Sequence, residues 1–312
     1  MLPRVRRLTH SDLTRDLDVT TEELRSLLDL AADVKRSPEL YRSALRGKSL
    51  ALLFEKPSLR TRVTFELAIQ QLGGFAILNE GPIGGREPLK DVARNLDRWV
   101  CGIVARTFRQ RTVDDLALWS SVPVINALSD MWHPCQALAD MQTIREHFGE
   151  TRGLRLAFVG DGNNVAGSVM LNATRLGMHF SIATPPGYAL PAEVVAMAED
   201  RESVEIAGDP VAAVRGAQIV YTDVWTSMGV EHEAAARLAA FAAYQVNDEL
   251  LSHAAPEAIF MHCLPAHRGE EVTDSVIESG RSVVFDEAEN RLHAQKALLL
   301  MLLGSGQDAV NS

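Results

Sequence analysis

The sequence predicts an α/β protein with two domains, each a mainly parallel sheet flanked by helices. Short apolar runs of strand length alternate with longer helical stretches along most of the chain. The 312 residues are enough for two cores of ordinary size. Gly149 and Gly153 follow a long helical stretch and mark a joint. We expect a first domain over residues 1–149 and a second over 150–286, with the last helix, about 287–312, returning towards the first domain.

The first half of the chain opens with helices and then alternates strand and helix. Helix start signals at Ser11 and Thr20 precede a leucine-rich periodic stretch, so residues 11–47 are predicted to be helical. Apolar runs predict strands at 49–54, 75–78, 101–104 and 122–126. Helices are expected over 89–99, 113–119 and 134–147.

The second half repeats this alternation. Strands are predicted at 154–159, 179–184, 203–206, 218–222, 258–262 and 282–285. The last helix is expected to open at Asp286 and to run past Leu303.

Composition and charge narrow the class of protein. Apolar residues make up 46% and charged residues 23%, as in globular proteins, and no apolar run approaches the roughly 20 residues of a bilayer span. Acidic residues come too early for a transit peptide, and the three cysteines are odd in number without metal-ligand spacing. The net charge of -10 disfavours binding to nucleic acid or to anionic membranes. We therefore expect a cytoplasmic protein without a structural metal or disulfide framework.

One stretch has the features of an anion site. Pro57 ends the first predicted strand, and Ser58 is placed to cap the helix that follows. A helix N-terminus offers unpaired backbone N–H groups, and Arg60 and Arg62 add positive charge beside it. By itself this pattern also fits a capped helix whose arginines only face water.

Two more strands of the first half end in anion-binding side chains. Arg106 follows the third strand, and His133 and Gln136 follow the fourth, with Pro134 suited to a first helical turn. Ligands of parallel sheets sit at the carboxyl ends of strands, so these side chains are expected to converge. Together with Ser58 and Arg60 they predict a site for a phosphate-sized anion.

The turn after residue 159 partly matches a dinucleotide fingerprint. Gly160 and Gly162 fit, but Val165 stands at the third glycine or alanine position. The next strand ends at Thr184, without the acid that holds a ribose hydroxyl. This favours a tight turn that leaves Asn163 or Asn164 to hydrogen-bond at the strand ends.

Three further residues at strand or helix ends have both a chemical and a structural interpretation. Asp223 closes a strand and is either a site carboxylate or a turn acid. Cys263 closes another and is either a reactive thiol or a small buried residue. Arg291, early in the last helix, either joins the anion site or pairs with the acids around it.

Taken in order, these motifs resemble those of the ornithine carbamoyltransferases. The resemblance runs from about residue 8 to 303 with the spacing intact. The Ser-Met-Gly and His-Cys-Leu-Pro motifs separate it from the aspartate carbamoyltransferases. It is carried by Ser58-Leu59-Arg60-Thr61-Arg62, Arg106-Thr107-Phe108, His133-Pro134-Cys135-Gln136, Asp223-Val224-Trp225-Thr226-Ser227-Met228-Gly229, His262-Cys263-Leu264-Pro265 and Glu289-Asn290-Arg291.

The resemblance implies transfer of a carbamoyl group from carbamoyl phosphate to L-ornithine, giving citrulline and phosphate, within arginine metabolism. It implies no cofactor and no metal, and an assembly of three chains or a multiple of three. Carbamoyl phosphate would be bound by Ser58, Leu59, Arg60, Thr61, Arg106, His133, Gln136, Cys263, Leu264 and Arg291. Ornithine would be bound by Asn164, Asp223, Ser227 and Met228. The catalytic residues would be Cys263, His133, Arg106 and Asp223.

Two departures keep other readings open. Leu59 stands where many members of this family have threonine. Some members have leucine or methionine there, and certain of those use acylated ornithine. Pro82 replaces a glutamine that reaches a neighbouring subunit's site in many members, so that contact is not expected here. The alternatives are a carbamoyltransferase for acylated ornithine or putrescine, and a catalytically silent regulatory homologue.

Overall fold

The structure is a computed structural model that describes residues 5–227 and 231–304. Its contacts divide the chain into two compact units. Unit 1 is Met1–Gln142 with Glu289–Ser312, and unit 2 is Thr143–Ala288. Among the described helices, none is both long and apolar enough to cross a bilayer.

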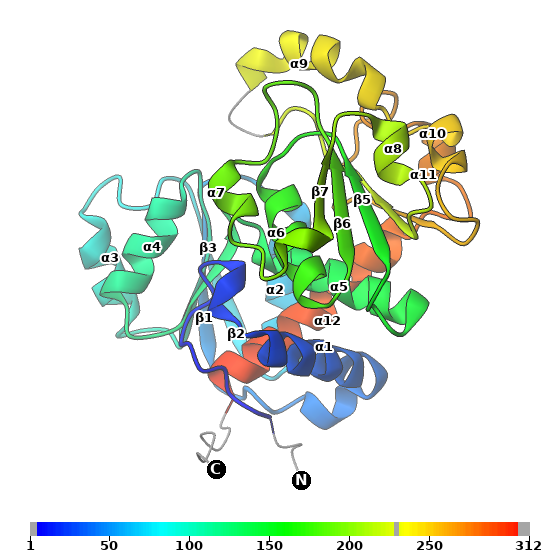
Figure 1. The fold of residues 1–312 in the computed structure, drawn as a ribbon. Helices are drawn as coiled ribbons and strands as arrows, with labels where there is room; N and C mark the ends of the chain where they lie inside the picture. Colours follow the sequence, from blue (N-terminus) through cyan, green and yellow to red (C-terminus); the bar gives the residue numbers. More distant parts are fainter. Residues whose placement is uncertain (1–4, 228–230, 305–312) are drawn as a thin grey trace. The chain divides into compact units, whose positions relative to one another are not determined.

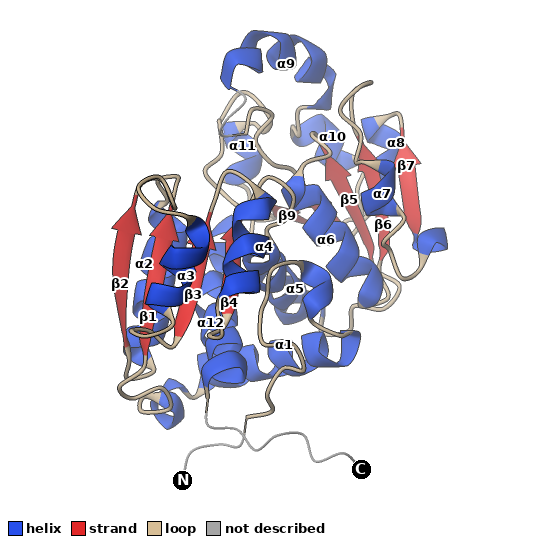
Figure 2. Cartoon of the chain, turned by 90° about the vertical axis from the view of Figure 1, so that its left-hand side faces the viewer, coloured by secondary structure: helices blue, strands red, loops and turns tan. Residues whose placement is uncertain are grey.

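Unit 1 contains a four-stranded parallel sheet in the order β2-β1-β3-β4 (Figure 2). The strands are β1 (Ser49–Phe54), β2 (Phe75–Glu80), β3 (Gly102–Arg106) and β4 (Val124–Leu128). The helices of this unit are α1 (Thr21–Arg36), α2 (Leu59–Gln71), α3 (Leu89–Leu96) and α4 (Gln110–Trp119), with the short turns η1 (Asp16–Asp18) and η2 (Pro38–Tyr41). The unit boundary falls within α5 (Pro134–Phe148) and α12 (Val284–Leu303).

Both faces of this sheet are covered, as continuous apolar strands require. Ala51 and Leu53 of β1 pack with Ala93 of α3 and with Val113 and Leu116 of α4. Figure 2 shows α3 and α4 in front of the strands and α2 behind them. Successive side chains of a strand point to opposite faces, so the burial of all six β1 residues follows from this double cover.

The start signal at Ser11 is misleading, because no helix begins there. Leu13 instead bridges to Ile125, and its N–H donates to the Val124 carbonyl at 2.9 Å. The segment thus covers the outer edge of β4 and satisfies its backbone groups. The signal at Thr20 is confirmed, since Thr20 and Glu23 form a capping box at the start of α1.

Unit 2 contains a five-stranded parallel sheet in the order β7-β6-β5-β8-β9, of which Figure 1 labels β7, β6 and β5. Its strands are β5 (Arg155–Val159), β6 (His179–Ala183), β7 (Val204–Ala207), β8 (Ile219–Tyr221) and β9 (Ile259–Met261). Its helices are α6 (Asn164–Arg175), α7 (Ala192–Val195), α8 (Pro210–Val214), α9 (Ala234–Phe241), α10 (Asp248–Ser252) and α11 (Asp274–Ile277), with η3 (Arg201–Ser203), η4 (Glu231–Glu233) and η5 (Ala242–Tyr244).

The predicted fold class, two helix-flanked parallel sheets, is confirmed, and one predicted strand is wrong. Residues 282–285 form no strand: Ser282 makes a single bridge to Phe260, and α12 begins at Val284, before the expected Asp286. The apolar pair Val283 and Val284 is buried at a helix start, and a short apolar run does not distinguish that from a strand.

The strand orders locate a candidate site in each unit. In unit 1 the chain passes from β1 to β2 on one side and then returns to β3 on the other. In unit 2 it passes from β5 to β6 and then returns to β8 on the other side. Loops diverge at such switch points and leave room for a ligand at the carboxyl ends of the central strands.

Candidate active site

In unit 1 the first two strand ends of the predicted anion site are adjacent. Phe54 of β1 pairs in register with Arg106 of β3. Beyond β1, the Ser58 hydroxyl accepts a hydrogen bond from the Thr61 N–H at 3.3 Å and caps α2, as predicted. Leu59 is 75% exposed, so the side chain that replaces the usual threonine lies in no core.

The third strand end is shaped by a tight turn. The pairing of β3 with β4 shifts register between Ala105 and Arg106, and the Arg106 side chain is buried. After β4, the Ser129 hydroxyl accepts hydrogen bonds from the N–H groups of Met131 at 3.2 Å and Trp132 at 3.1 Å. This turn delivers His133 to the start of α5.

Arg291 connects three helices of unit 1. Its Nη1 donates to Gln136 Oε1 at 2.5 Å and its Nη2 donates to Thr61 Oγ1 at 3.0 Å. Gln136 Nε2 in turn donates to Asp140 Oδ1 at 2.8 Å. All four side chains are buried. Arg291 is thus bonded to two residues of the predicted anion site, Gln136 and Thr61, rather than to the acids beside it in sequence.

The electrostatics of His133 show that the cations converge. Burial lowers the pKa of His133 well below 6.5, and the charges of Arg291, Arg106 and Arg60 lower it further. The imidazole is therefore neutral at physiological pH, and three guanidinium groups lie close enough to act on it. Nearby, burial raises the pKa of Cys135 to about 12, so that thiol stays protonated.

In unit 2, Asp223 is the centre of a small polar cluster. It is 5% exposed, and its two carboxylate oxygens accept from Cys263 Sγ at 3.1 Å and from Asn163 Nδ2 at 2.8 Å. Asn163 also caps α6 through its Oδ1, which accepts from the N–H groups of Val165 and Ala166. Asn164, the predicted ligand residue, lies in the first turn of α6.

The turn that carries Cys263 is held by a histidine. Leu264 has a left-handed backbone with φ of 56°, and its N–H donates to His262 Nδ1 at 2.8 Å. Because Nδ1 accepts, Nε2 carries the proton, and it lies 3.1 Å from Glu271 Oε1. Ser227 is described and half-buried, whereas Met228 lies outside the described residues.

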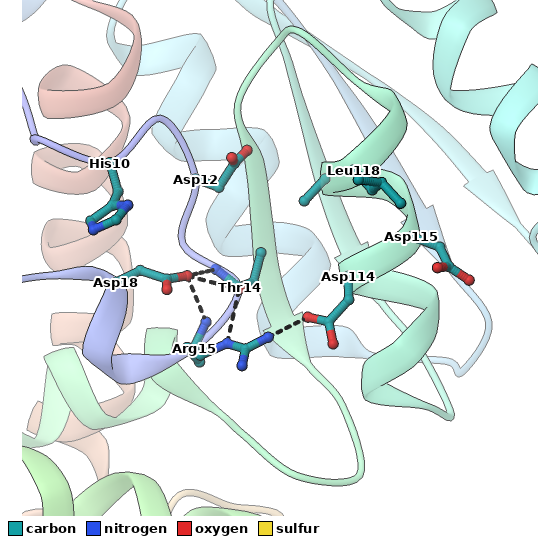
Figure 3. A pocket seen from close by; sticks show the side chains of 9 residues that line it. His10, Asp12, Thr14, Arg15, Asp18, Asp114, Asp115 and Leu118 are labelled. Atoms are coloured by element: carbon teal, nitrogen blue, oxygen red, sulfur yellow. Dashed lines mark hydrogen bonds and ion pairs between the residues drawn. The ribbon is translucent and has the colours of Figure 1, made fainter. Parts of the chain in front are cut away.

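A separate hollow of about 470 Å³ lies beside the outer edge of β4, and none of the predicted site residues lines it (Figure 3). Its acidic side chains already have partners. Asp18 accepts from Thr14, and Asp114 accepts from Arg15 Nη2 at 2.6 Å. The other two carboxylates are engaged in the same way, Asp12 by the Val124 N–H and Asp115 by Arg111, so the acids of this hollow serve local contacts.

Sequence reasoning missed one residue that contacts a predicted site residue, and it left a second one undecided. Asp140 lies four residues after Gln136, a spacing that puts both on one helix face and could have revealed it. Asn163 was left as an alternative to Asn164, and only the fold shows that its side chain reaches Asp223.

Two family models together match nearly the whole chain. Residues 11–146 match the aspartate/ornithine carbamoyltransferase carbamoyl-P binding domain, and residues 152–302 match the Asp/Orn binding domain of the same family. The chain belongs to the aspartate/ornithine carbamoyltransferase family. The resemblance expected from the motifs is thereby confirmed.

Relatives within this family are similar over almost their full length. The ornithine carbamoyltransferase of Thermococcus kodakarensis is 52% identical, over 92% of this chain and 94% of its own. Among solved structures, the ornithine carbamoyltransferase from Pyrococcus furiosus superposes with a TM-score of 0.91 at 48% identity, covering 95% of this chain and 98% of its own. That from Thermus thermophilus gives 0.87 at 49% identity, covering 94% and 99%.

Proposed function

We propose that this protein transfers the carbamoyl group of carbamoyl phosphate to the δ-amine of L-ornithine, giving L-citrulline and phosphate. Relatives about half identical over nearly the whole chain carry this activity in their names. The observation that carries the proposal is the buried Arg291, which bonds Gln136 and Thr61 and, with Arg106 and Arg60, lowers the pKa of His133. This set of side chains suits a dianionic donor that also presents a carbonyl group.

Unit 1 would hold the donor. Arg60, Arg106 and Arg291 would bind the phosphate oxygens together with the N-terminus of α2, where Ser58 and Thr61 form the cap and Leu59 offers its backbone N–H. Each charge-assisted hydrogen bond contributes about 1.5–3 kcal/mol. The catalytic share is the part that strengthens as negative charge moves onto the leaving phosphate.

His133 and Gln136 would hold the carbamoyl group itself. The neutral imidazole can donate one hydrogen bond to the carbonyl oxygen, where negative charge develops during attack. Gln136 Oε1 accepts from Arg291, which fixes the amide beside His133, where it would contact the carbamoyl NH₂. The family resemblance implies that Cys263 and the Leu264 backbone would also bind carbamoyl phosphate.

Unit 2 would hold the acceptor through Asn164, Asp223, Ser227 and Met228. Asp223 would pair with the α-ammonium group, and Cys263, 3.1 Å from that carboxylate, would help to orient the amine and assist its proton loss. By analogy with lysine the δ-amine has a pKa of about 10.4, so the neutral amine costs roughly 4.6 kcal/mol at pH 7. A site rich in guanidinium groups lowers that cost because it disfavours a further cation.

The division of labour between units and the assembly are parts of the same proposal. Residues 1–149, completed by 287–312, would bind carbamoyl phosphate, and residues 150–286 would bind ornithine. A homotrimer, or a multiple of it, would cover the exposed apolar Phe75 and Ile77 of the edge strand β2. Sedimentation equilibrium tests this assembly, and we expect a mass three times that of the chain or a multiple of it.

We propose a cytoplasmic location, as expected from the sequence. The three cysteines, all within the described residues, form no disulfide, which supports a reducing compartment.

One assay tests the proposed reaction. Citrulline formation is measured with ornithine, N-acetylornithine, N-succinylornithine and putrescine side by side, each with carbamoyl phosphate. We expect turnover with ornithine at a kcat/KM far above the others. Preference for an acylated acceptor or putrescine would assign the alternative specificity, and no turnover with any would favour a silent regulatory homologue.

A further inference from the structure

Arg237 of α9 binds three segments of unit 2 at once. Its Nη1 donates to Asp161 Oδ2 at 2.8 Å and to the Trp225 carbonyl at 2.9 Å. Its Nε donates to Glu233 Oε2 at 2.9 Å, and its guanidinium carbon lies 4.8 Å from the centre of the Tyr188 ring. Only 11% of its side chain is exposed. A planar guanidinium with several fixed donors is suited to this kind of multiple contact.

The partners of Arg237 lie next to the proposed acceptor residues. Asp161 lies two residues before Asn163, the side chain that donates to Asp223. Trp225 lies midway between Asp223 and Ser227 in sequence, and its ring stacks at 5.7 Å on Phe241 of the same helix as Arg237. Arg237 therefore links the turn after β5, which leads to Asn163, to the segment after β8, which carries Asp223 and Ser227.

The charges around Asp161 explain why this link needs a cation. Burial raises the pKa of Asp161 to about 6, and the nearby carboxylates of Asp223 and Glu233 also raise it, whereas Arg237 lowers it. Without Arg237, the buried carboxylate of Asp161 would face Asp223 without the cation that now lowers its pKa. The placement of Asp223 is thus coupled to Arg237 across one intervening side chain, that of Asp161.

We propose that Arg237 is a positioning residue for the acceptor side of the site, which fixes the spacing of Asn163, Asp223 and Ser227 by bonding Asp161 and the Trp225 carbonyl. The inference rests on the proposed function of Asp223 in binding ornithine. It assigns Arg237 no contact with substrate. Its effect passes through the two segments that it joins.

The test compares KM values for the two substrates in Arg237→Gln, Arg237→Lys and Asp161→Asn. We expect Arg237→Gln to raise the KM for ornithine by about tenfold or more, while the KM for carbamoyl phosphate stays within about twofold. Arg237→Lys should recover part of the loss, because lysine keeps the charge beside Asp161 but lacks the second nitrogen that bonds Glu233. Asp161→Asn should give a smaller rise in the same KM.

A matched control is Arg268→Gln, which removes a guanidinium in the same unit that pairs with Asp274 and Glu278. It should leave both KM values unchanged. Equal rises in both KM values for the Arg237 variants, or an unchanged KM for ornithine, would overturn the inference. If Arg237→Gln fails to fold, the KM split in Arg237→Lys decides between these outcomes.

A parallel variant, Asp223→Asn, separates this inference from the proposed function. If it leaves the KM for ornithine unchanged, the assignment of Asp223 fails, whatever the Arg237 variants do. If Asp223→Asn raises that KM and Arg237→Gln does not, only the positioning role fails.

Discussion

Replacing Arg291 with methionine tests the donor site most directly. In the structure this guanidinium is buried and donates to Gln136 and Thr61, both within the predicted site. Methionine has a similar length and flexibility but no charge and no donor. The variant therefore removes one of three guanidinium groups and leaves most of the local volume filled.

The expected magnitude follows from the strength of one set of charge-assisted hydrogen bonds. A loss of about 1.5–3 kcal/mol corresponds to a 10- to 150-fold weaker affinity at 1.36 kcal/mol per factor of ten. We expect the KM for carbamoyl phosphate, and the inhibition constant of inorganic phosphate against it, to rise by this factor. The pKa of His133 should also rise, because Arg291 has the largest lowering effect on it among the charged side chains.

The assay varies carbamoyl phosphate at saturating ornithine, and then ornithine at saturating carbamoyl phosphate. The matched control is Arg94→Met, since Arg94 is an exposed arginine of α3 that lies 4.7 Å from the Trp119 ring. This control should leave both constants unchanged. A folded Arg291→Met protein whose KM for carbamoyl phosphate rises by less than about threefold would refute the reasoning.

Three further predictions follow from the same geometry. Because the pKa of His133 is depressed, the unfolded chain takes up a proton near pH 6.5 and the folded chain does not; stability should fall below that pH by up to about 1.36 kcal/mol per unit. In His133→Asn, the free energy of unfolding measured with urea should change less between pH 7 and pH 5.5 than it does in the wild-type protein. An equal change in both proteins would count against a buried neutral imidazole. Cys263→Ser should lower kcat while the KM for carbamoyl phosphate stays within about twofold. If the variant kept the kcat of the wild-type protein at every pH, Cys263 would have no part in the mechanism. Gly162→Ala should destabilise the protein by about 1–3 kcal/mol, because a Cβ there would lie 2.3 Å from the Leu190 nitrogen. Gly208→Ala is the control, since a Cβ there would meet no atom within 4 Å, and it should leave stability unchanged. Equal melting temperatures for the two variants would contradict this packing.

Features that depend on neighbours in sequence could be predicted without the fold. The Ser58 cap, the Thr20 capping box and most strands follow from local hydrogen bonding and from the length of apolar runs. The convergence of Arg106 and His133 also followed, because parallel strands of one sheet bring their carboxyl ends to the same edge.

The sequence by itself therefore determined the fold class, the family and the strand ends where the chemistry is expected. Only the tertiary structure decided which partners these groups take. Arg291 bonds Thr61 across 230 residues, Asn163 reaches Asp223 across 60, and the segment at Leu13 pairs with β4 instead of forming a helix. The physical reason is that a buried polar group must satisfy its hydrogen bonds with whatever the fold places beside it, and local sequence carries no record of those distant partners.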